Sequence, residues 1–196
     1  MRMIRRAVYG LKAAFILPYL LLWRLSSQRE IVEADTRRWR DCFLRGEGGN
    51  SAAFLRLMIE RQEFRTLFYH RIGLPGPFKL FARPLPTLYI VTRDIGPGMV
   101  LQHGFATIIN ATSIGRDCWV NQQVTIGATA RGGAPRIGDD VIINAGAQVL
   151  GDIRVGDGVR IGANAVVVKD VPAGCTVAGV PARIIRRGDL RVDEAL

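Results

Sequence analysis

The sequence contains two histidines, His70 and His103, the residue type that most often serves as a general base near neutral pH. His103 lies in the segment Leu101-Gln-His-Gly-Phe-Ala, and its imidazole can accept a proton from a substrate hydroxyl. The segment alone does not require this chemistry, because a histidine on the surface of a rigid coil has the same context. We interpret His70 as structural, or as a cation near the end of a helix. No nucleophile–histidine–acid spacing is recognisable, and no cysteine–histidine cluster indicates a metal site.

The element that must position any such chemistry is a six-residue repeat over residues 137–172. A branched aliphatic residue returns at Ile137, Ile143, Val149, Val155, Ile161 and Val167. A smaller apolar set lies four positions after each, at Val141, Ala147, Ile153, Val159, Ala165 and Val171. Neither a helix nor a simple strand keeps this period, whereas stacked coils of short strands do. We therefore expect the aliphatic residues to point inward and to stack from coil to coil.

Earlier coils are expected from about Ile95 to residue 131, with two interruptions. One extra residue after Leu101 shifts the register, which predicts inward residues at Ile108, Ile114, Val120 and Ile126. The next aliphatic residue, Ile137, follows after an interval of 11 instead of six. The segment 128–135 must therefore leave the coil as a loop, and loops on a rigid scaffold often carry function.

Residues 1–24 combine an apolar run with Arg2, Arg5, Arg6, Lys12 and Arg24, and contain no acidic residue. The run at 13–23 is too short to cross a bilayer, and no small-residue cleavage site marks it as a signal peptide. One interpretation is a helix on an anionic membrane face, with Tyr19 and Trp23 at the interface. The other is a helix packed on the rest of the protein or on a neighbouring subunit, and the sequence leaves both open.

Between this segment and the repeat we expect helices. Residues 29–48 are amphipathic, and a second helix capped by Asn50 or Ser51 runs past Phe68. Prolines and glycines at 75–77 and 84–86 indicate a linker. The predicted organisation is a basic apolar helix at 1–28, a helical region and linker at 29–86, the repeat domain at 87–187, and a polar tail at 188–196.

Composition and the cysteine pattern limit the class of protein. The chain has 196 residues, 48% apolar content and a formal net charge of +10, but no nucleic-acid-binding module is visible. Cys42, Cys118 and Cys175 are far apart and form no CxxC pair, so we expect reduced thiols, with Cys118 at a small inward position of the repeat. We expect a cytoplasmic protein, peripheral on the cytoplasmic face of the inner membrane if residues 1–24 bind lipid.

The repeat, His103-Gly, the extruded loop and the closing segment Ala178-Gly-Val-Pro-Ala-Arg-Ile-Ile together resemble the hexapeptide-repeat acyltransferases. The resemblance extends over roughly residues 54–187. It is to the serine-acetyltransferase-like group, which includes members of exopolysaccharide and capsule synthesis. It implies a mainly β fold, a left-handed parallel β-helix preceded by an α-helical N-terminal region. It also implies a homotrimer, acetyl-CoA as donor without a metal, and an active site in the groove between neighbouring β-helices.

The resemblance also implies roles for individual residues. His103 matches the general base, and a backbone N–H near Gly127 on the facing coil would stabilise the oxyanion. Small coil positions along the pantetheine arm correspond to Ala145, Gly162 and Ala163. The cations expected at the CoA phosphates are Lys169, Arg183 and Arg186. The residues expected near the acceptor are Gln102, Gln122 and Arg131.

Four positions depart from the serine acetyltransferase pattern. The loop arginine and second histidine are replaced by Gly133 and Ala134, and two aspartates by Gln102 and a residue near Leu88. These departures favour an O-acetyltransferase acting on a sugar hydroxyl in surface-polysaccharide (exopolysaccharide or capsule) biosynthesis. The alternatives are serine O-acetyltransferase in cysteine biosynthesis, an amino-sugar N-acetyltransferase, and a non-catalytic β-helix scaffold.

Overall fold

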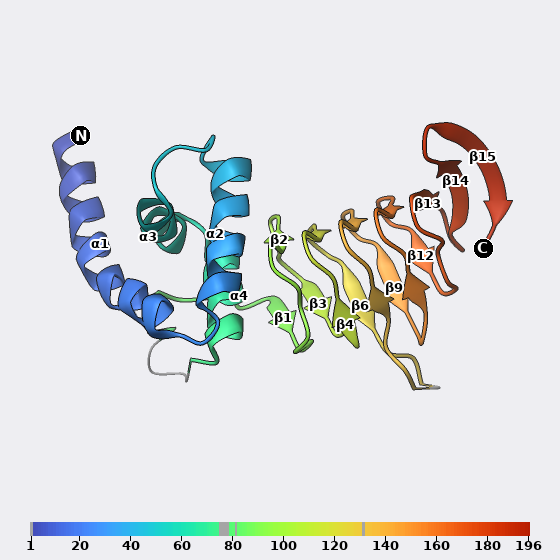
Figure 1. Cartoon of the computed structure of the whole chain (residues 1–196), viewed down its shortest axis with the longest axis horizontal. Coiled ribbons are helices and arrows are strands. Elements are labelled where there is room, and N and C mark those ends of the chain that lie inside the picture. Colours follow the sequence, from blue (N-terminus) through green and yellow to red (C-terminus); the bar gives the residue numbers. More distant parts are fainter. Residues whose placement is uncertain (1, 75–78, 81, 131) are drawn as a thin grey trace. The chain divides into compact units, whose positions relative to one another are not determined.

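The computed structural model describes residues 2–74, 79–80, 82–130 and 132–196; for residues 2–11 and 13 it describes the backbone alone. The chain forms two compact units, residues 1–85 and 86–196. The expected linker at 75–77 lies outside the described residues. The helices of the first unit are α1 (Arg2–Leu25), α2 (Arg29–Phe43), α3 (Asn50–Glu60) and α4 (Gln62–Ile72) (Figure 1). None of the described helices combines the length and apolarity needed to cross a membrane.

Aromatic rings form the centre of the helical unit. The Trp23 ring lies 4.8 Å from that of Phe54, and the Tyr19 ring 5.9 Å from that of Tyr69, measured between centroids. Trp23 and Tyr19 are only 1% and 3% exposed, and the Trp23 Nε1–H donates to the carbonyl of Arg29. The expectation that these two rings lie at a membrane interface is therefore wrong, because they pack inside the protein.

The second expected helix is divided into α3 and α4. Arg61 has extended backbone angles, φ −121° and ψ 108°, and ends one helix while it begins the next. The first of the two begins after Gly49, not after a side-chain cap from Asn50 or Ser51. Helix α4 is tied to α2 by a buried ion pair in which Arg71 Nε lies 2.9 Å from Asp35 Oδ2.

The second unit is a parallel β-helix with three faces, along which equivalent short strands of successive coils pair in register (Figure 1). The first face contains β1 (Leu88–Ile90), β3 (Thr107–Ile109), β6 (Thr125–Gly127), β9 (Gln148–Leu150) and β12 (Val166–Val167). The second contains β4 (Ser113–Ile114), β7 (Arg136–Ile137) and β10 (Arg154–Val155). The third contains β2 (Val100–Leu101), β5 (Trp119–Val120), β8 (Ile142–Ile143), β11 (Arg160–Ile161) and β13 (Cys175–Ala178).

Two antiparallel strands extend the third face, β14 (Arg183–Arg187) and β15 (Leu190–Ala195). The residues expected as a polar tail, 188–196, thus include a strand that pairs with its neighbour. The repeat ends here because an antiparallel hairpin replaces the next parallel coil.

The core of the β-helix follows the six-residue repeat. Every aliphatic residue of the main set from Ile137 to Val167 is at most 4% exposed, and every residue of the smaller set is at most 6% exposed. Cys118 is also buried, as expected, and all three cysteines are free thiols. Because apolar area buried between coils is the main favourable term in such a stack, the repeat predicts the core closely.

One predicted core residue is wrong. Ile108 is 43% exposed, whereas its neighbour Ile109 is completely buried. The distance in sequence from Leu101 to the next inward residue is therefore eight instead of the seven that we expected. The coil contains two additional residues after Leu101, and they lie at the corner that carries His103.

Glycines at the corners between the second and third faces permit the close stacking of coils. A Cβ atom on Gly115 would lie 2.6 Å from the carbonyl carbon and oxygen of Gly138 in the next coil. Asp139 follows that glycine, and its Oδ1 accepts a hydrogen bond of 2.9 Å from the backbone N–H of Arg116. In the next coil Asp157 accepts in the same way from the N–H of Asp139, so Ile-Gly-Asp at 137–139 and Val-Gly-Asp at 155–157 are explained by backbone contact between coils.

Candidate active site

His103 lies on an insertion at the corner between the third and first faces. Four residues occupy equivalent positions, because each follows a strand of the third face and donates its backbone N–H to the next coil: Gln102, Asn121, Asn144 and Gly162. Phe105 and Gln122 are also equivalent, because their carbonyls accept corresponding hydrogen bonds from the next coil. The N–H of Gln123 donates to the carbonyl of Phe105, and the N–H of Gly146 donates to the carbonyl of Gln122. His103 and Gly104 are therefore the two additional residues, and they lie outside the regular coil.

The backbone of this insertion is unusual. His103 has φ of +62° and Ala106 has φ of +50°, a left-handed conformation that residues with a Cβ adopt at a cost. The His103 side chain is exposed, and its Nε2 lies 3.5 Å from Gln102 Nε2. Of the described residues, no acidic side chain contacts the ring. Leu88, at the position expected for an orienting carboxylate, is a buried apolar residue of β1.

Three of the predicted site residues line up along the same corner. The column formed by equivalent positions of successive coils is Phe105, Gln122, Ala145 and Ala163. The coils are joined by backbone hydrogen bonds of 2.9–3.1 Å, from Gln123 to Phe105, from Gly146 to Gln122 and from Asn164 to Ala145. Two of the four side chains are methyl groups, so this corner leaves room for an extended ligand beside the backbone. Sequence reasoning missed Phe105, because its position depends on the insertion.

Gly162 also lies at this corner, but the fold itself requires it to be small. A Cβ atom there would approach the Cβ of Ala178 to 3.0 Å and the carbonyl oxygen of Val177 to 3.2 Å. The glycine is therefore explained by contact with the last coil, whether or not a ligand lies beside it.

Gly127 and the extruded loop lie at the other edge of the first face. Gly127 ends β6, whereas the His103 corner precedes the strands of that face, so one chain does not bring the two residues together. The segment 128–135 leaves the coil as predicted, and a groove of about 740 Å³ beside it is lined by Thr129, Gly133, Asp152 and Val168, among others. Arg131 lies outside the described residues.

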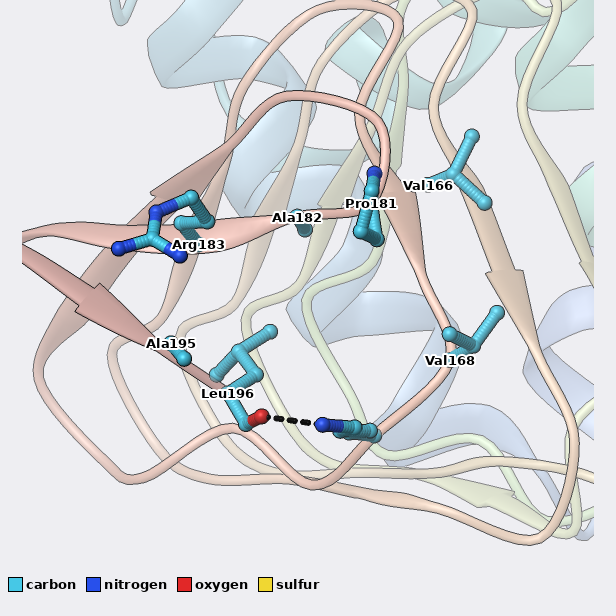
Figure 2. A pocket seen from close by; sticks show the side chains of 8 residues that line it. Val166, Val168, Pro181, Ala182, Arg183, Ala195 and Leu196 are labelled. Atoms are coloured by element: carbon cyan, nitrogen blue, oxygen red, sulfur yellow. Dashed lines mark hydrogen bonds between the residues drawn. The ribbon is translucent and has the colours of Figure 1, made fainter.

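The predicted phosphate-binding cations lie near the C-terminal hairpin. A pocket of about 100 Å³ is lined by Lys169 and Arg183. Figure 2 shows Arg183, Ala195 and Leu196 on one side of this pocket and Val166 and Val168 on the other. Lys169 Nζ donates to the main-chain oxygen of Leu196 at 2.6 Å. Arg186 is exposed on β14 and does not line the pocket.

Carboxylates of β15 already pair with arginines of β14. Arg183 Nε lies 2.6 Å from Asp193 Oδ1, and Arg187 Nη2 lies 2.7 Å from Glu194 Oε2. The hydrogen bond from Arg187 lowers the pKa of the Glu194 carboxyl, and the same bond raises the pKa of Arg187. A phosphate group that bound Arg183 would have to replace Asp193, a contact that sequence reasoning missed because the antiparallel pairing of this segment was not recognised.

An apolar patch lies on the first face beside the His103 corner. Tyr89 and Val91 are each 59% exposed, Phe105 is 45% exposed and Ile108 is 43% exposed. Tyr89 and Ile108 are register partners on neighbouring strands. An exposed apolar cluster of this kind is typical of a surface that another protein covers.

The described residues contain no group of three or more histidine, cysteine, aspartate or glutamate side chains that could hold a metal ion. At the corner between the third and first faces, the exposed imidazole of His103 is able to transfer a proton.

Comparisons with known proteins agree with this geometry. Residues 134–169 match the family model of the bacterial transferase hexapeptide (six repeats). A serine acetyltransferase of Synechococcus elongatus is 44% identical over 103 residues, which are 50% of this chain and 42% of that protein. The solved soybean serine acetyltransferase complexed with serine is 30% identical, covers 81% of this chain and 70% of its own, and has a TM-score of 0.57. The chain belongs to the hexapeptide-repeat acyltransferases.

Membership of this family fixes the fold class as a left-handed parallel β-helix preceded by helices. Another solved member is a serine acetyltransferase in complex with CoA, which is 27% identical, covers 80% of this chain and 68% of its own, and has a TM-score of 0.60. The chain spans only about two fifths of the length of the Synechococcus relative, 42%.

The expectation of a sugar O-acetyltransferase in polysaccharide biosynthesis is contradicted by these comparisons. The relatives and the solved structures are named serine acetyltransferases. The expectation rested on what Gly133, Ala134 and Gln102 lack, and a missing contact does not specify a different acceptor. The comparisons support the alternative, serine as acceptor.

Proposed function

We propose that this hexapeptide-repeat acyltransferase is a serine O-acetyltransferase that uses acetyl-CoA as donor and His103 as general base. The observation that carries the proposal is the exposed His103 on its own insertion, in a chain 44% identical to a serine acetyltransferase over half its length. A solved relative in complex with CoA and another with serine support the two substrates.

His103 performs the proton transfer in this proposal. Its ring accepts the proton of the serine hydroxyl while the hydroxyl oxygen attacks the thioester carbonyl. The tetrahedral oxyanion then collapses, the carbon–sulfur bond breaks, and the protonated ring returns the proton to the leaving thiolate. No acyl-enzyme is needed, because both substrates are held next to each other.

The corner column supplies the path for the donor. Ala145 and Ala163 present methyl groups, so the pantetheine arm can lie against the backbone of successive coils. Lys169 and Arg183 would bind the CoA phosphates, with Arg183 exchanging Asp193 for a phosphate oxygen. Gln102 and Gln122 lie on the same corner as His103 and would contact the acceptor.

A trimer would complete the site. Gly127 cannot reach His103 within one chain, but the corresponding residue of a neighbouring subunit can supply its backbone N–H to the oxyanion. The apolar patch at Tyr89, Phe105 and Ile108 would be covered by that neighbour. The site would therefore lie between two copies of the chain.

The test is a panel of acceptors. CoA release is measured with purified protein, acetyl-CoA, and in turn L-serine, a nucleotide sugar, or no acceptor. The proposal expects serine to raise the rate well above the other two and O-acetylserine to be the product. CoA release that serine does not increase would refute serine as acceptor.

A further inference from the structure

The positive charge of this protein is concentrated in its helical unit. Residues 1–85 contain 16 of the 27 lysines and arginines but only 7 of the 17 acidic residues, an excess of nine charges. Residues 86–196 contain the remaining 11 and 10, and are nearly neutral. The proposed acetyl transfer takes place in the second unit and does not explain this asymmetry.

Helix α1 has two apolar faces, of which the fold uses one. Ile16, Tyr19 and Trp23 point into the unit and are at most 4% exposed. On the opposite face, Leu17, Leu21 and Leu25 are 53%, 61% and 76% exposed. Ala14 and Pro18 are also exposed and belong to the same face, since residues 14, 18, 21 and 25 follow helical spacing. We call these five residues the outer face of α1.

A cationic pocket lies within the same unit. It has a volume of about 330 Å³ and is lined by Lys12, Arg65 and Arg83 together with apolar residues that include Phe15 and Leu80. No acidic side chain is among its described lining residues. The Nε of Arg65 is buried and has no hydrogen-bond partner among the residues that the structure describes. Lys12 follows the helical spacing of the inward residues Ile16, Tyr19 and Trp23, so this pocket lies on the side of α1 opposite to the outer face and adds only to the positive charge of the unit.

We propose that the outer face of α1 docks in the plane of an anionic phospholipid membrane, with the exposed Arg24 beside it attracted to the headgroups. The apolar strip supplies area to bury and the basic unit supplies attraction to negative headgroups. A second copy of the chain is a poorer occupant, because pairing two outer faces would bring two strongly basic units together.

The test is co-sedimentation of the full-length protein with vesicles of phosphatidylcholine and with vesicles of phosphatidylcholine and phosphatidylglycerol in equal parts. Binding is expected on the anionic vesicles and should weaken with added salt. Leu17→Ser combined with Leu21→Ser should reduce the partition by about tenfold for each leucine withdrawn from the interface. The matched control is Leu190→Ser, since Leu190 is 68% exposed in the other unit and should not affect binding.

Arg24→Gln tests the electrostatic part of the docking. Arg24 is exposed next to Leu25, and the loss of its charge should reduce the partition about fivefold on anionic vesicles only. Equal partition of the wild-type protein onto both kinds of vesicle, or no effect of the leucine variant, would overturn the proposal. The proposal would also be overturned if the wild type did not bind vesicles but self-associated without lipid, as measured by sedimentation, and the leucine variant lost that self-association. The measurement requires no acetyl transfer, so it succeeds or fails independently of the proposed enzymatic function.

Discussion

The ion pair between Arg71 and Asp35 should be the most sensitive polar contact of the helical unit. It is bidentate, with Nε–Oδ2 at 2.9 Å and Nη2–Oδ1 at 3.3 Å. The side chains are 5% and 2% exposed, so water cannot replace the lost partner. Asp35→Ala leaves the guanidinium charge buried without its carboxylate and should lower the free energy of unfolding by about 3–5 kcal/mol. That is a large part of the total for a small unit, ~5–15 kcal/mol.

The assay is urea unfolding followed by the circular dichroism of the helices, which in the described chain all lie within residues 2–72. The control is Glu60→Ala in the same unit, since the pair of Glu60 with Arg56 is 3.1 Å long but 37% and 44% exposed. An exposed pair of this kind contributes only about 0.3–0.5 kcal/mol. The double variant Asp35→Leu with Arg71→Met should be more stable than Asp35→Ala, because neither charge remains buried.

A loss below about 1 kcal/mol in Asp35→Ala would refute this reasoning, since that is the value of a solvent-exposed pair. A double variant less stable than the single one would also refute it, because the cost would then come from lost packing and not from an unpaired charge.

Three further predictions concern the β-helix. Gly115→Ala should destabilise the stack by more than about 1 kcal/mol, measured by thermal unfolding, because its Cβ would lie 2.6 Å from the backbone of Gly138; an unchanged Tm would contradict the close stacking. Ala163→Trp should raise the KM for acetyl-CoA at least about tenfold at unchanged Tm, since Ala163 is exposed on the proposed donor path; an unchanged KM would place the donor elsewhere. The pKa of Glu194, measured by NMR titration, should lie below its ordinary 4.5 and rise in Arg187→Gln. The contact between Arg187 and Glu194 should therefore be present at pH values above the lowered pKa of Glu194 and be lost as the pH falls through it.

The repeat predicts most of the β-helix, because its period is a local property of the sequence. Between Ile137 and Val167 equivalent inward residues of neighbouring coils lie 18 positions apart, so they can be counted without knowledge of the fold. The count failed at Ile108, since the sequence does not show which residues of Gln102–Ile109 form the insertion. The helical unit was predicted less well: the break at Arg61 depends on how α3 and α4 pack, and the burial of Trp23 depends on Phe54, which lies on another helix.

Individual site residues came from family resemblance, and the structure adds how they are arranged. Ala145 and Ala163 share one corner with His103, which follows from the stacking of coils. Gly127 lies at the opposite edge of the first face, and the oxyanion role that we propose for it would require a second chain, which no single sequence can place. The acceptor was mispredicted because small differences in the loop were given more weight than the similarity to serine acetyltransferases over half of the chain.

The most direct test of the account is the rate of CoA release from acetyl-CoA and L-serine by His103→Asn, with His70→Asn as the matched control. We expect His103→Asn to lower the turnover by about two to four orders of magnitude, the usual effect of losing a general base. We expect wild-type turnover for His70→Asn and unchanged unfolding of the β-helix in both. Turnover in His103→Asn equal to that of the wild type would contradict the account, because no other described histidine lies on the β-helix.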